Sequence, residues 1–188
     1  MDRYHRRSIR LKGSDYSKPG YYFVTVCTRE RESIFGKIID FSMVCNQMGE
    51  IVEKVWSELP IHFPKVKTDQ FIIMPNHMHG IIQVIPNKRS ELSSGNMCLL
   101  NQAPIQGSIS EGWIMMKSTS VTLGKIIRNF KAKSTREIRN KMNNSFCWQR
   151  NYFEHIIRDK NELFRIREYI LDNPENWSQD DDNLMNGH

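Results

Sequence analysis

Two short apolar segments joined by a Pro-Asn pair constrain this fold more than any other feature. Residues 66–74 and 79–85 are rich in β-branched and aromatic side chains, and the Pro-Asn pair between them is a turn signal. We therefore expect two strands that pair as a hairpin. A third strand is expected at residues 21–28, an aromatic and β-branched run that directly follows a Pro-Gly pair.

Helical periodicity predicts three helices. Apolar side chains recur every three or four positions in residues 46–59 and 120–142, and a capping-box pair begins a last helix at residues 160–171. A short fourth strand is expected at residues 146–149. The order strand, helix, two strands, helix, strand, helix predicts an α+β fold with a ferredoxin-like (RRM-like) antiparallel sheet and helices packed on one face.

The length of 188 residues predicts a single domain over residues 1–188. Residues 1–19 are polar and basic and are expected to form an arm. Residues 86–119 lack periodicity and are expected to be a variable loop, while residues 178–188 form an acidic tail. A composition of 39% hydrophobic and 26% charged residues excludes wholesale disorder.

Composition also limits the partners that the chain can have. No segment approaches the roughly 18 apolar residues that a membrane span needs, and the N-terminus lacks the apolar core of a signal peptide. We therefore expect a cytoplasmic, nucleoid-associated protein with no membrane partner. The four cysteines form no CxxC pair, which indicates neither a disulfide framework nor structural zinc. A net charge of +6 favours polyanionic partners, with nucleic acid first among them.

Two histidines flank Met78 at the start of one expected strand. The period of a strand puts His77 and His79 on one face and Met78 on the other. Two neutral imidazoles on one rigid strand make half of a metal site. Taken alone, the same pattern also describes a pair of surface histidines on a hairpin.

A second group of candidate residues lies near Tyr152. If this segment is helical, Tyr152 and His155 share a face, and a tyrosine beside a third nitrogen ligand suits covalent phosphoryl transfer. A phenol with a pKa of about 10 must be oriented and its anion stabilised, most simply by a cation. Glu154 would lie on another face as a reserve ligand. The alternative is a core tyrosine with a satisfied hydroxyl.

Three blocks of the sequence resemble the REP-associated tyrosine transposases, which belong to the single-tyrosine branch of the HUH (His, hydrophobic, His) endonuclease and transposase superfamily. The blocks are RRSIRLKGSDYSKPGYYFVTVCT, PNHMHG, and WQRNYFEHIIRD followed by a helix that ends in DNPENW. The similarity runs from about residue 3 to residue 177 and leaves the variable loop and the acidic tail unmatched.

The resemblance implies metal-dependent cleavage of single-stranded DNA without ATP. His77 and His79 would hold a divalent cation, Mg²⁺ or Mn²⁺, and Tyr152 would attack the scissile phosphate. This attack would leave a 5′-phosphotyrosine intermediate and a free 3′-OH, and another 3′-OH could reverse it and join strands. Family members carry a third ligand a few residues past the tyrosine, a place that His155 fits. Two or three imidazoles would suit Mn²⁺ better than Mg²⁺.

The substrate that the resemblance implies is a repeated extragenic palindrome, a DNA hairpin with a short single-stranded foot. The basic arm could read the foot, while the basic helix could hold the backbone of the stem. Otherwise these charges form a solvated helix face. The candidate DNA contacts are Arg3, Arg6, Arg7 and Arg10 in the arm, and Lys125, Arg128, Lys131, Lys133, Arg136 and Arg150 in or near the helix.

Three other functions stay open on the sequence alone. The chain could be a catalytically inactive nucleic-acid-binding module with a ferredoxin-like sheet. It could be a metal-dependent hydrolase in which water attacks in place of the tyrosine. It could also be a plasmid replication initiator or relaxase, although such proteins usually carry further domains. The sequence allows a homodimer and a monomer equally.

Overall fold

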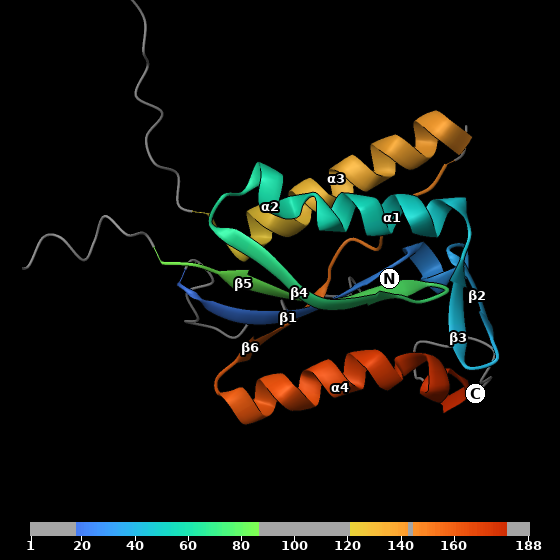
Figure 1. Ribbon diagram of the computed structural model, residues 1–188. Coiled ribbons are helices and arrows are strands. Elements are labelled where there is room, and N and C mark those ends of the chain that lie inside the picture. The colour runs from blue at the N-terminus through green and yellow to red at the C-terminus, as the bar shows by residue number, and fades with distance from the viewer. Residues whose placement is uncertain (1–17, 87–120, 143–144, 180–188) are drawn as a thin grey trace, which may run out of the picture.

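A four-stranded antiparallel sheet in the order β4-β5-β1-β6 forms the centre of the molecule (Figure 1). The computed structural model describes residues 18–86, 121–142 and 145–179. The predicted hairpin of β4 and β5 is confirmed, as is the strand after the Pro-Gly pair. The strands are β1 (Gly20–Cys27), β4 (Val66–Ile73), β5 (His77–Val84) and β6 (Phe153–Ile157).

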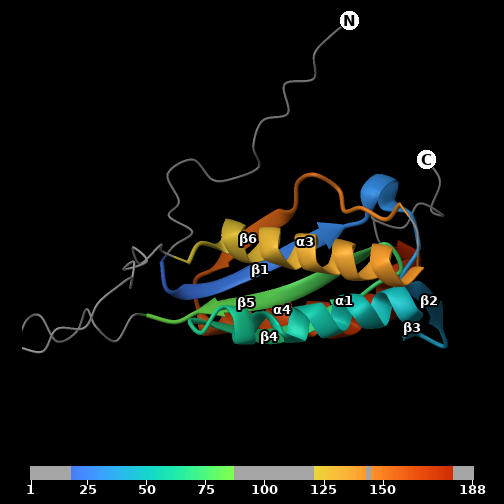
Figure 2. The same cartoon turned by 90° about the horizontal axis from the view of Figure 1, so that it is seen from above.

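Helices cover both faces of this sheet. The helices α1 (Gln47–Ser57) and α3 (Leu123–Met142) pack on what we call the α1/α3 face, and α4 (Lys160–Asn176) packs on the opposite α4 face (Figures 1 and 2). The prediction that the helices lie on one face is therefore wrong for α4. The reason is visible in β5, which is buried at nearly every position and so needs cover on both sides.

The two faces hold separate hydrophobic clusters. The α1/α3 cluster includes Val24, Trp56 and Phe130, while the α4 cluster includes Phe23 and Ile170. Alternate residues of β1 thus enter opposite clusters, as the period of a strand requires. An antiparallel sheet within a mixed α/β architecture is confirmed, whereas the finer ferredoxin-like assignment stays a prediction.

Local capping explains where two helices begin. The side chain of Asn46 accepts hydrogen bonds from the backbone of Met48 and Gly49 at the start of α1. The predicted capping-box-like start of α4 is confirmed for the N-cap, because Asp159 accepts from the backbone N–H of Glu162 at 2.8 Å. The Glu162 carboxylate accepts from the backbone N–H of Arg158, one residue before the N-cap. The helix then continues to Asn176, past the end predicted at residue 171.

Several elements differ from the predictions. The hairpin of β2 (Gly36–Ile39) and β3 (Ser42–Cys45) and the short helix α2 (Leu59–His62) were not predicted. Residues 146–149 form no strand, and only Trp148 makes an isolated bridge to Thr28. The strand β6 lies further along instead, where a helix was considered, and it pairs with β1 at the edge of the sheet.

The described residues contain no helix that is long and apolar enough to cross a membrane. The predicted variable loop, acidic tail and basic arm lie almost entirely outside the described residues. The arm residues Arg3, Arg6, Arg7 and Arg10 are among those outside.

Candidate active site

Two buried histidines meet on the α4 face. His77 and His79 are 0% and 3% exposed, and their Nε2 atoms lie 3.0 Å apart. Met78 between them packs in the α1/α3 cluster. The predicted placement of the two imidazoles on one face is therefore confirmed.

Each histidine ring is fixed through its other nitrogen. His77 Nδ1 lies 2.8 Å from Asn76 Oδ1, and His79 Nδ1 lies 2.8 Å from Thr25 Oγ1. Asn76 in turn donates its amide N–H to the carbonyl of Arg31 at 3.1 Å, which orients its oxygen toward His77. Burial, with a smaller contribution from Arg31, lowers the pKa of His77 to about 3. His77 is thus neutral, and with its proton on Nδ1 its Nε2 lone pair faces the other ring, as in histidines that bind metals.

Helix α4 brings a tyrosine to this pair. The hydroxyl of Tyr169 lies 3.4 Å from His79 Nε2, and the two ring centroids are 5.3 Å apart. Phe23 stacks on His79 at 5.4 Å and meets Tyr169 edge-on at 6.0 Å. Tyr169 remains 49% exposed, so that solvent or a ligand can reach it.

A buried amide lies one turn further along the same helix. Trp177, two turns after Tyr169, packs against His77 with ring centroids 5.9 Å apart. Asn173 occurs midway between these two aromatic residues, at i+4 from Tyr169, and therefore shares their helix face toward the histidines. Asn173 is 3% exposed, and its Oδ1 has no hydrogen-bond partner. A buried oxygen of this kind costs roughly 1–3 kcal/mol unless a ligand satisfies it.

An ion pair fixes α4 on the sheet. Arg167 donates to both carboxylate oxygens of Asp69 on β4, at 2.8 and 2.6 Å. The register of β4 against β5 shifts between Thr68 and Phe71, so Asp69 lies where the strand pairing is irregular. The Arg167 guanidinium holds the pKa of the Asp69 carboxyl below its usual value. This two-point contact lies two residues from Tyr169 and restrains the helix that carries it.

The structure does not bring Tyr152 to the histidines. Tyr152 directly precedes Phe153, whose partner Thr25 is also the partner of His79, so Phe153 lies on the α4 face and Tyr152 on the other. Tyr152 packs against the α1/α3 cluster, and Lys131 Nζ lies 5.8 Å from its ring centroid. The prediction of a shared site was wrong because the segment is extended, not helical.

His155 does not join the histidine pair either. It lies on the α4 face, but β1 separates its strand from that of His79, and two strand spacings amount to about 10 Å. Its Nε2 lies 2.7 Å from the carboxylate of Glu162. Glu154 faces the α1/α3 side. In the part of the chain that the structure describes, no three His, Cys, Asp or Glu side chains gather as a metal-binding group.

Comparisons with known proteins agree with the sequence resemblance. No protein-family model matches the chain. An uncharacterised protein of Haemophilus influenzae is 42% identical over 177 residues, covering 94% of this chain and 92% of that protein, so the two share a family. A second Haemophilus influenzae protein, described as a candidate REP-associated tyrosine transposase, is 25% identical over 160 residues, covering 85% of this chain and 73% of that protein. The chain is thus similar in sequence to a protein described as a REP-associated tyrosine transposase.

A solved structure has a fold similar to that of this chain. It is described as a REP-associated tyrosine transposase bound to a REP hairpin, and it superposes with a TM-score of 0.54 at 16% identity. The superposition covers 90% of this chain and 74% of that transposase. The antiparallel sheet and helices of this chain thus match the fold of a REP-associated tyrosine transposase.

The basic residues predicted to contact DNA in and near α3 occupy three different environments. Arg128, Arg136 and Arg150 line a cavity of about 920 Å³ between α3 and the segment before β6, together with Lys131. Lys125 is exposed on α3 outside that lining. Lys133 is directed elsewhere, because it pairs with Glu58.

Lys131 has a structural role at the wall of this cavity. Its ammonium donates to the carbonyl oxygens of Gln149 at 2.7 Å and Asn151 at 3.0 Å. Burial lowers the pKa of Lys131 to about 8. Lys131 therefore fixes the segment that leads into β6.

Sequence reasoning missed Tyr169 and Asn173. Both belong to the block ending in DNPENW, which carried the transposase resemblance. Their spacing from each other and from Trp177 is four residues, the spacing that places side chains on one helix face. This regular spacing was the available signal.

Proposed function

We propose that this protein is a metal-dependent endonuclease and strand transferase that acts on single-stranded DNA at REP-like hairpins, with Tyr169 as its nucleophile. The main support is the position of the Tyr169 hydroxyl, 3.4 Å from Nε2 of His79 in the buried histidine pair. A second support is the relationship to the REP-associated tyrosine transposases. Tyr152 is replaced as the candidate because it lies on the other face of the sheet.

The residues around this pair fit a divalent cation. His77 and His79 would hold it through Nε2, and Asn173 would hold it through Oδ1, which otherwise has no partner in its buried position. Asn173 thereby replaces His155 as the candidate third ligand. Two imidazoles and an amide oxygen suit Mn²⁺ better than Mg²⁺, which prefers oxygen ligands. The cation would polarise a phosphate oxygen and favour the phenolate.

In this proposal the tyrosine exchanges one phosphodiester for another. The Tyr169 oxygen loses its proton and forms a bond to phosphorus, while the bond from phosphorus to the 3′ oxygen breaks and that oxygen gains a proton. The products are a 5′-phosphotyrosine and a free 3′-OH. A second 3′-OH can attack the phosphotyrosine and join two strands, because the bond type is conserved.

The chain's own residues would orient both reactants. Phe23 packs against His79 and Tyr169 together, and the Asp69–Arg167 pair restrains the helix. Because the tyrosine and the histidines belong to one chain, one copy would hold a complete site.

The basic residues would bind the hairpin outside the reacting centre. The solved relative is described as bound to a REP hairpin, and we extend this class of substrate to the present chain. Arg128, Arg136 and Arg150 would contact phosphates of the stem from the cavity beside α3. Lys131 and Lys133 would act mainly through the protein contacts described above, and the role of the N-terminal arm stays a prediction.

A covalent-adduct assay tests the nucleophile. The protein is incubated with Mn²⁺ and a 3′-labelled hairpin oligonucleotide that carries an unpaired 5′ extension, and the label on denatured protein is measured. We expect an adduct with the wild type and with Tyr152→Phe, and none with Tyr169→Phe. Circular dichroism of each variant reports whether it is folded.

The reverse pattern, an adduct with Tyr169→Phe and none with folded Tyr152→Phe, would overturn the assignment. Hairpin binding without any adduct in the wild type would favour a catalytically inactive binding module. Cleavage that releases both products without bound label would favour a hydrolase in which water attacks.

A further inference from the structure

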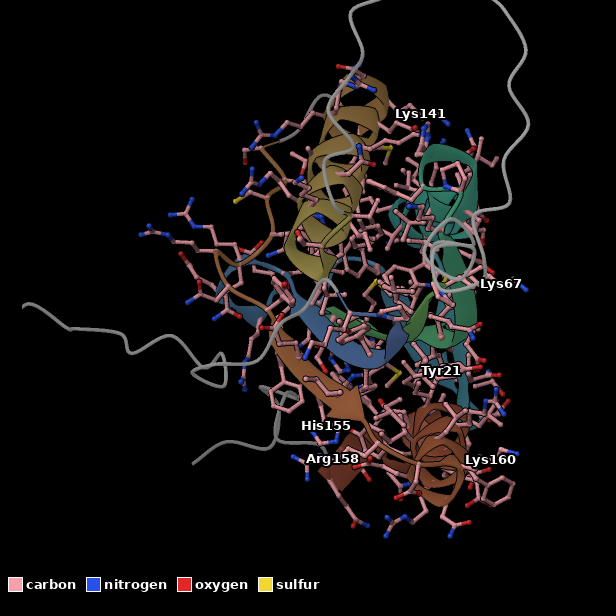
Figure 3. All side chains as sticks on the ribbon, turned by 90° about the vertical axis from the view of Figure 1, so that its left-hand side faces the viewer. Tyr21, Lys67, Lys141, His155, Arg158 and Lys160 are labelled. Carbon is pink, nitrogen blue, oxygen red and sulfur yellow. The ribbon has the colours of Figure 1, made fainter. Side chains whose placement is uncertain are left out.

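A surface pocket lies beside the candidate active site at the open edge of the sheet. It has a volume of about 410 Å³ and includes Phe23, Phe153, Ile166 and Arg165 in its lining, and we call it the β6-edge pocket. Strand β6 is the outer strand of the described sheet next to β1. Figure 3 views the sheet along its strands and labels His155 of β6, close to Arg158 and α4.

A continuous set of aromatic rings connects this pocket to the histidine pair. Phe153 meets Phe23 edge-on with centroids 6.2 Å apart, and Phe23 in turn stacks on His79. Phe23 also contacts Tyr169. Yet Phe153 itself is 45% exposed, although it lies in the same row across the sheet as His79. An aromatic face is thus open to solvent one ring away from the proposed reacting centre.

The rim of the β6-edge pocket is polar and held in place. His155 Nε2 lies 2.7 Å from one carboxylate oxygen of Glu162, and the other oxygen accepts the backbone N–H of Arg158 at 2.7 Å. Arg165, exposed on α4, precedes Tyr169 by four residues and so lies on the same helix face. A guanidinium at this position complements a phosphate that approaches the tyrosine.

We propose that the β6-edge pocket holds one unpaired nucleobase of the DNA strand that Tyr169 cleaves. The inference rests on the proposed function and adds to it a site for a base next to the scissile phosphate. The base stacks on Phe153, and Arg165 contacts the backbone. Stacking of this kind accepts any base, because every base has a π-face. The pocket therefore positions the strand, while sequence preference can arise from its polar rim.

Fluorescence of a base analogue tests this inference without cleavage. A hairpin oligonucleotide with an unpaired 5′ extension carries 2-aminopurine at one position at a time, and it is bound to the Tyr169→Phe protein. We expect quenching at one position of the extension. Adding Phe153→Ala should restore fluorescence at that position and weaken binding about 5- to 150-fold, whereas Phe153→Trp should retain both quenching and affinity.

A matched control and an altered substrate guard against folding effects. Phe164→Ala removes another exposed phenylalanine, 59% exposed on α4, and should change neither readout. An abasic site at the quenched position should weaken binding by the wild type but add little to the effect of Phe153→Ala. Equal responses of Phe153→Ala and Phe164→Ala at every position would overturn the inference. A change of oligomeric state in Phe153→Ala with unchanged DNA binding would assign the surface to a second copy and also overturn it.

The adduct assay separates this inference from the proposed function. An adduct in the wild type, with quenching that does not depend on Phe153, would support the nuclease proposal and contradict the binding of a base in the β6-edge pocket. Quenching that depends on Phe153, with no adduct in the wild type, would support base binding in the pocket and contradict the nuclease proposal.

Discussion

On its α1/α3 face the sheet presents Gly80 of β5 to the indole of Trp56, whereas on its α4 face the same strand presents His77 and His79 to Tyr169. A Cβ added to Gly80 would lie 2.4 Å from Trp56 Cζ2, so close packing there leaves no room for a larger side chain. On the other face each buried imidazole has an oxygen beside its Nδ1 atom. One strand thus serves dense apolar packing and polar chemistry through alternate residues.

The difference shows how a rigid site is built on a strand. Side chains of the α1/α3 face, such as Met78, hold the backbone through close contacts. The α4 face then carries polar groups whose hydrogen bonds keep them oriented in a buried position. Substitutions on the two faces should therefore have separable effects, on stability for one and on activity for the other.

The largest effect is expected from two adjacent substitutions on opposite faces. His77→Ala should lower the rate of adduct formation by about 10²–10⁴-fold, since loss of the proposed metal ligand would remove several kcal/mol of charge stabilisation. Met78→Ala should lower the free energy of unfolding by about 2–5 kcal/mol without changing the rate per folded molecule. Urea denaturation and single-turnover adduct assays measure the two quantities. A His77→Ala protein that still forms the adduct at the wild-type rate would show that the histidines are structural, and it would contradict the division of stability and activity between the two faces.

The next effect concerns the cation and the buried amide of α4. Asn173→Ala should weaken Mn²⁺ binding by at least about 10- to 100-fold, as measured by electron paramagnetic resonance of free Mn²⁺, because the proposed oxygen ligand is lost. Asn173→Asp should retain binding, since a carboxylate oxygen takes the same place. The control is Asn176→Ala, an exposed amide on the same helix. Equal Mn²⁺ affinities for Asn173→Ala and the control would remove Asn173 from the site.

A smaller effect is expected where α4 is fixed to β4. Asp69→Asn should lower the free energy of unfolding by about 1 kcal/mol or less at neutral pH, because Arg167 is 41% exposed and solvent screens the pair. It should slow adduct formation more than it weakens DNA binding, since α4 carries Tyr169. Asp172→Asn, which removes an exposed carboxylate of the same helix, is the control.

The pH dependence of this pair has a defined sign. The folded pKa of Asp69 is lowered from its ordinary value of 3.8, so the pair stabilises fully above that value. This stability is lost as the pH falls through the folded pKa. Urea denaturation should therefore show a constant difference between wild type and Asp69→Asn at neutral and mildly acidic pH, and this difference should shrink below pH 3.8 and vanish once the pH is below the lowered pKa of Asp69. A difference that persists there would mean that the carboxylate is not the stabilising group.

The sequence was sufficient to predict those features of the candidate site that are determined within a single strand or helix. The common face of His77 and His79 follows from the period of a single strand. The position of Tyr169 and Asn173 beside the histidines depends instead on which face of the sheet α4 covers, and no local pattern determines that choice. The interpretation of Tyr152 failed for a related reason, because a five-residue strand at the edge offers too few positions to separate strand from helix periodicity.

The missed hairpin of β2 and β3 has a local cause. Its turn places Asp40 and Phe41 at φ values of 47° and 59°, in the left-handed region that glycine or asparagine usually occupies. Phenylalanine gives no sign of such a turn. The sequence therefore predicted the strands of the sheet that carry the histidines but not this appended hairpin.

The smallest expected effect concerns the cations of the α1/α3 side. Replacing Arg128 and Arg136 together by Gln should weaken binding to the same extent for hairpins of different sequence. It should also make the slope of log affinity against log salt concentration less negative by about 2, since each phosphate contact contributes about 0.9. Lys133→Gln should leave the slope unchanged and act on stability, because Glu58 already neutralises that charge. Fluorescence anisotropy over a range of salt concentrations measures both slopes. Equal slopes for all three proteins would restrict the α1/α3 side to packing and assign DNA binding to other parts of the chain.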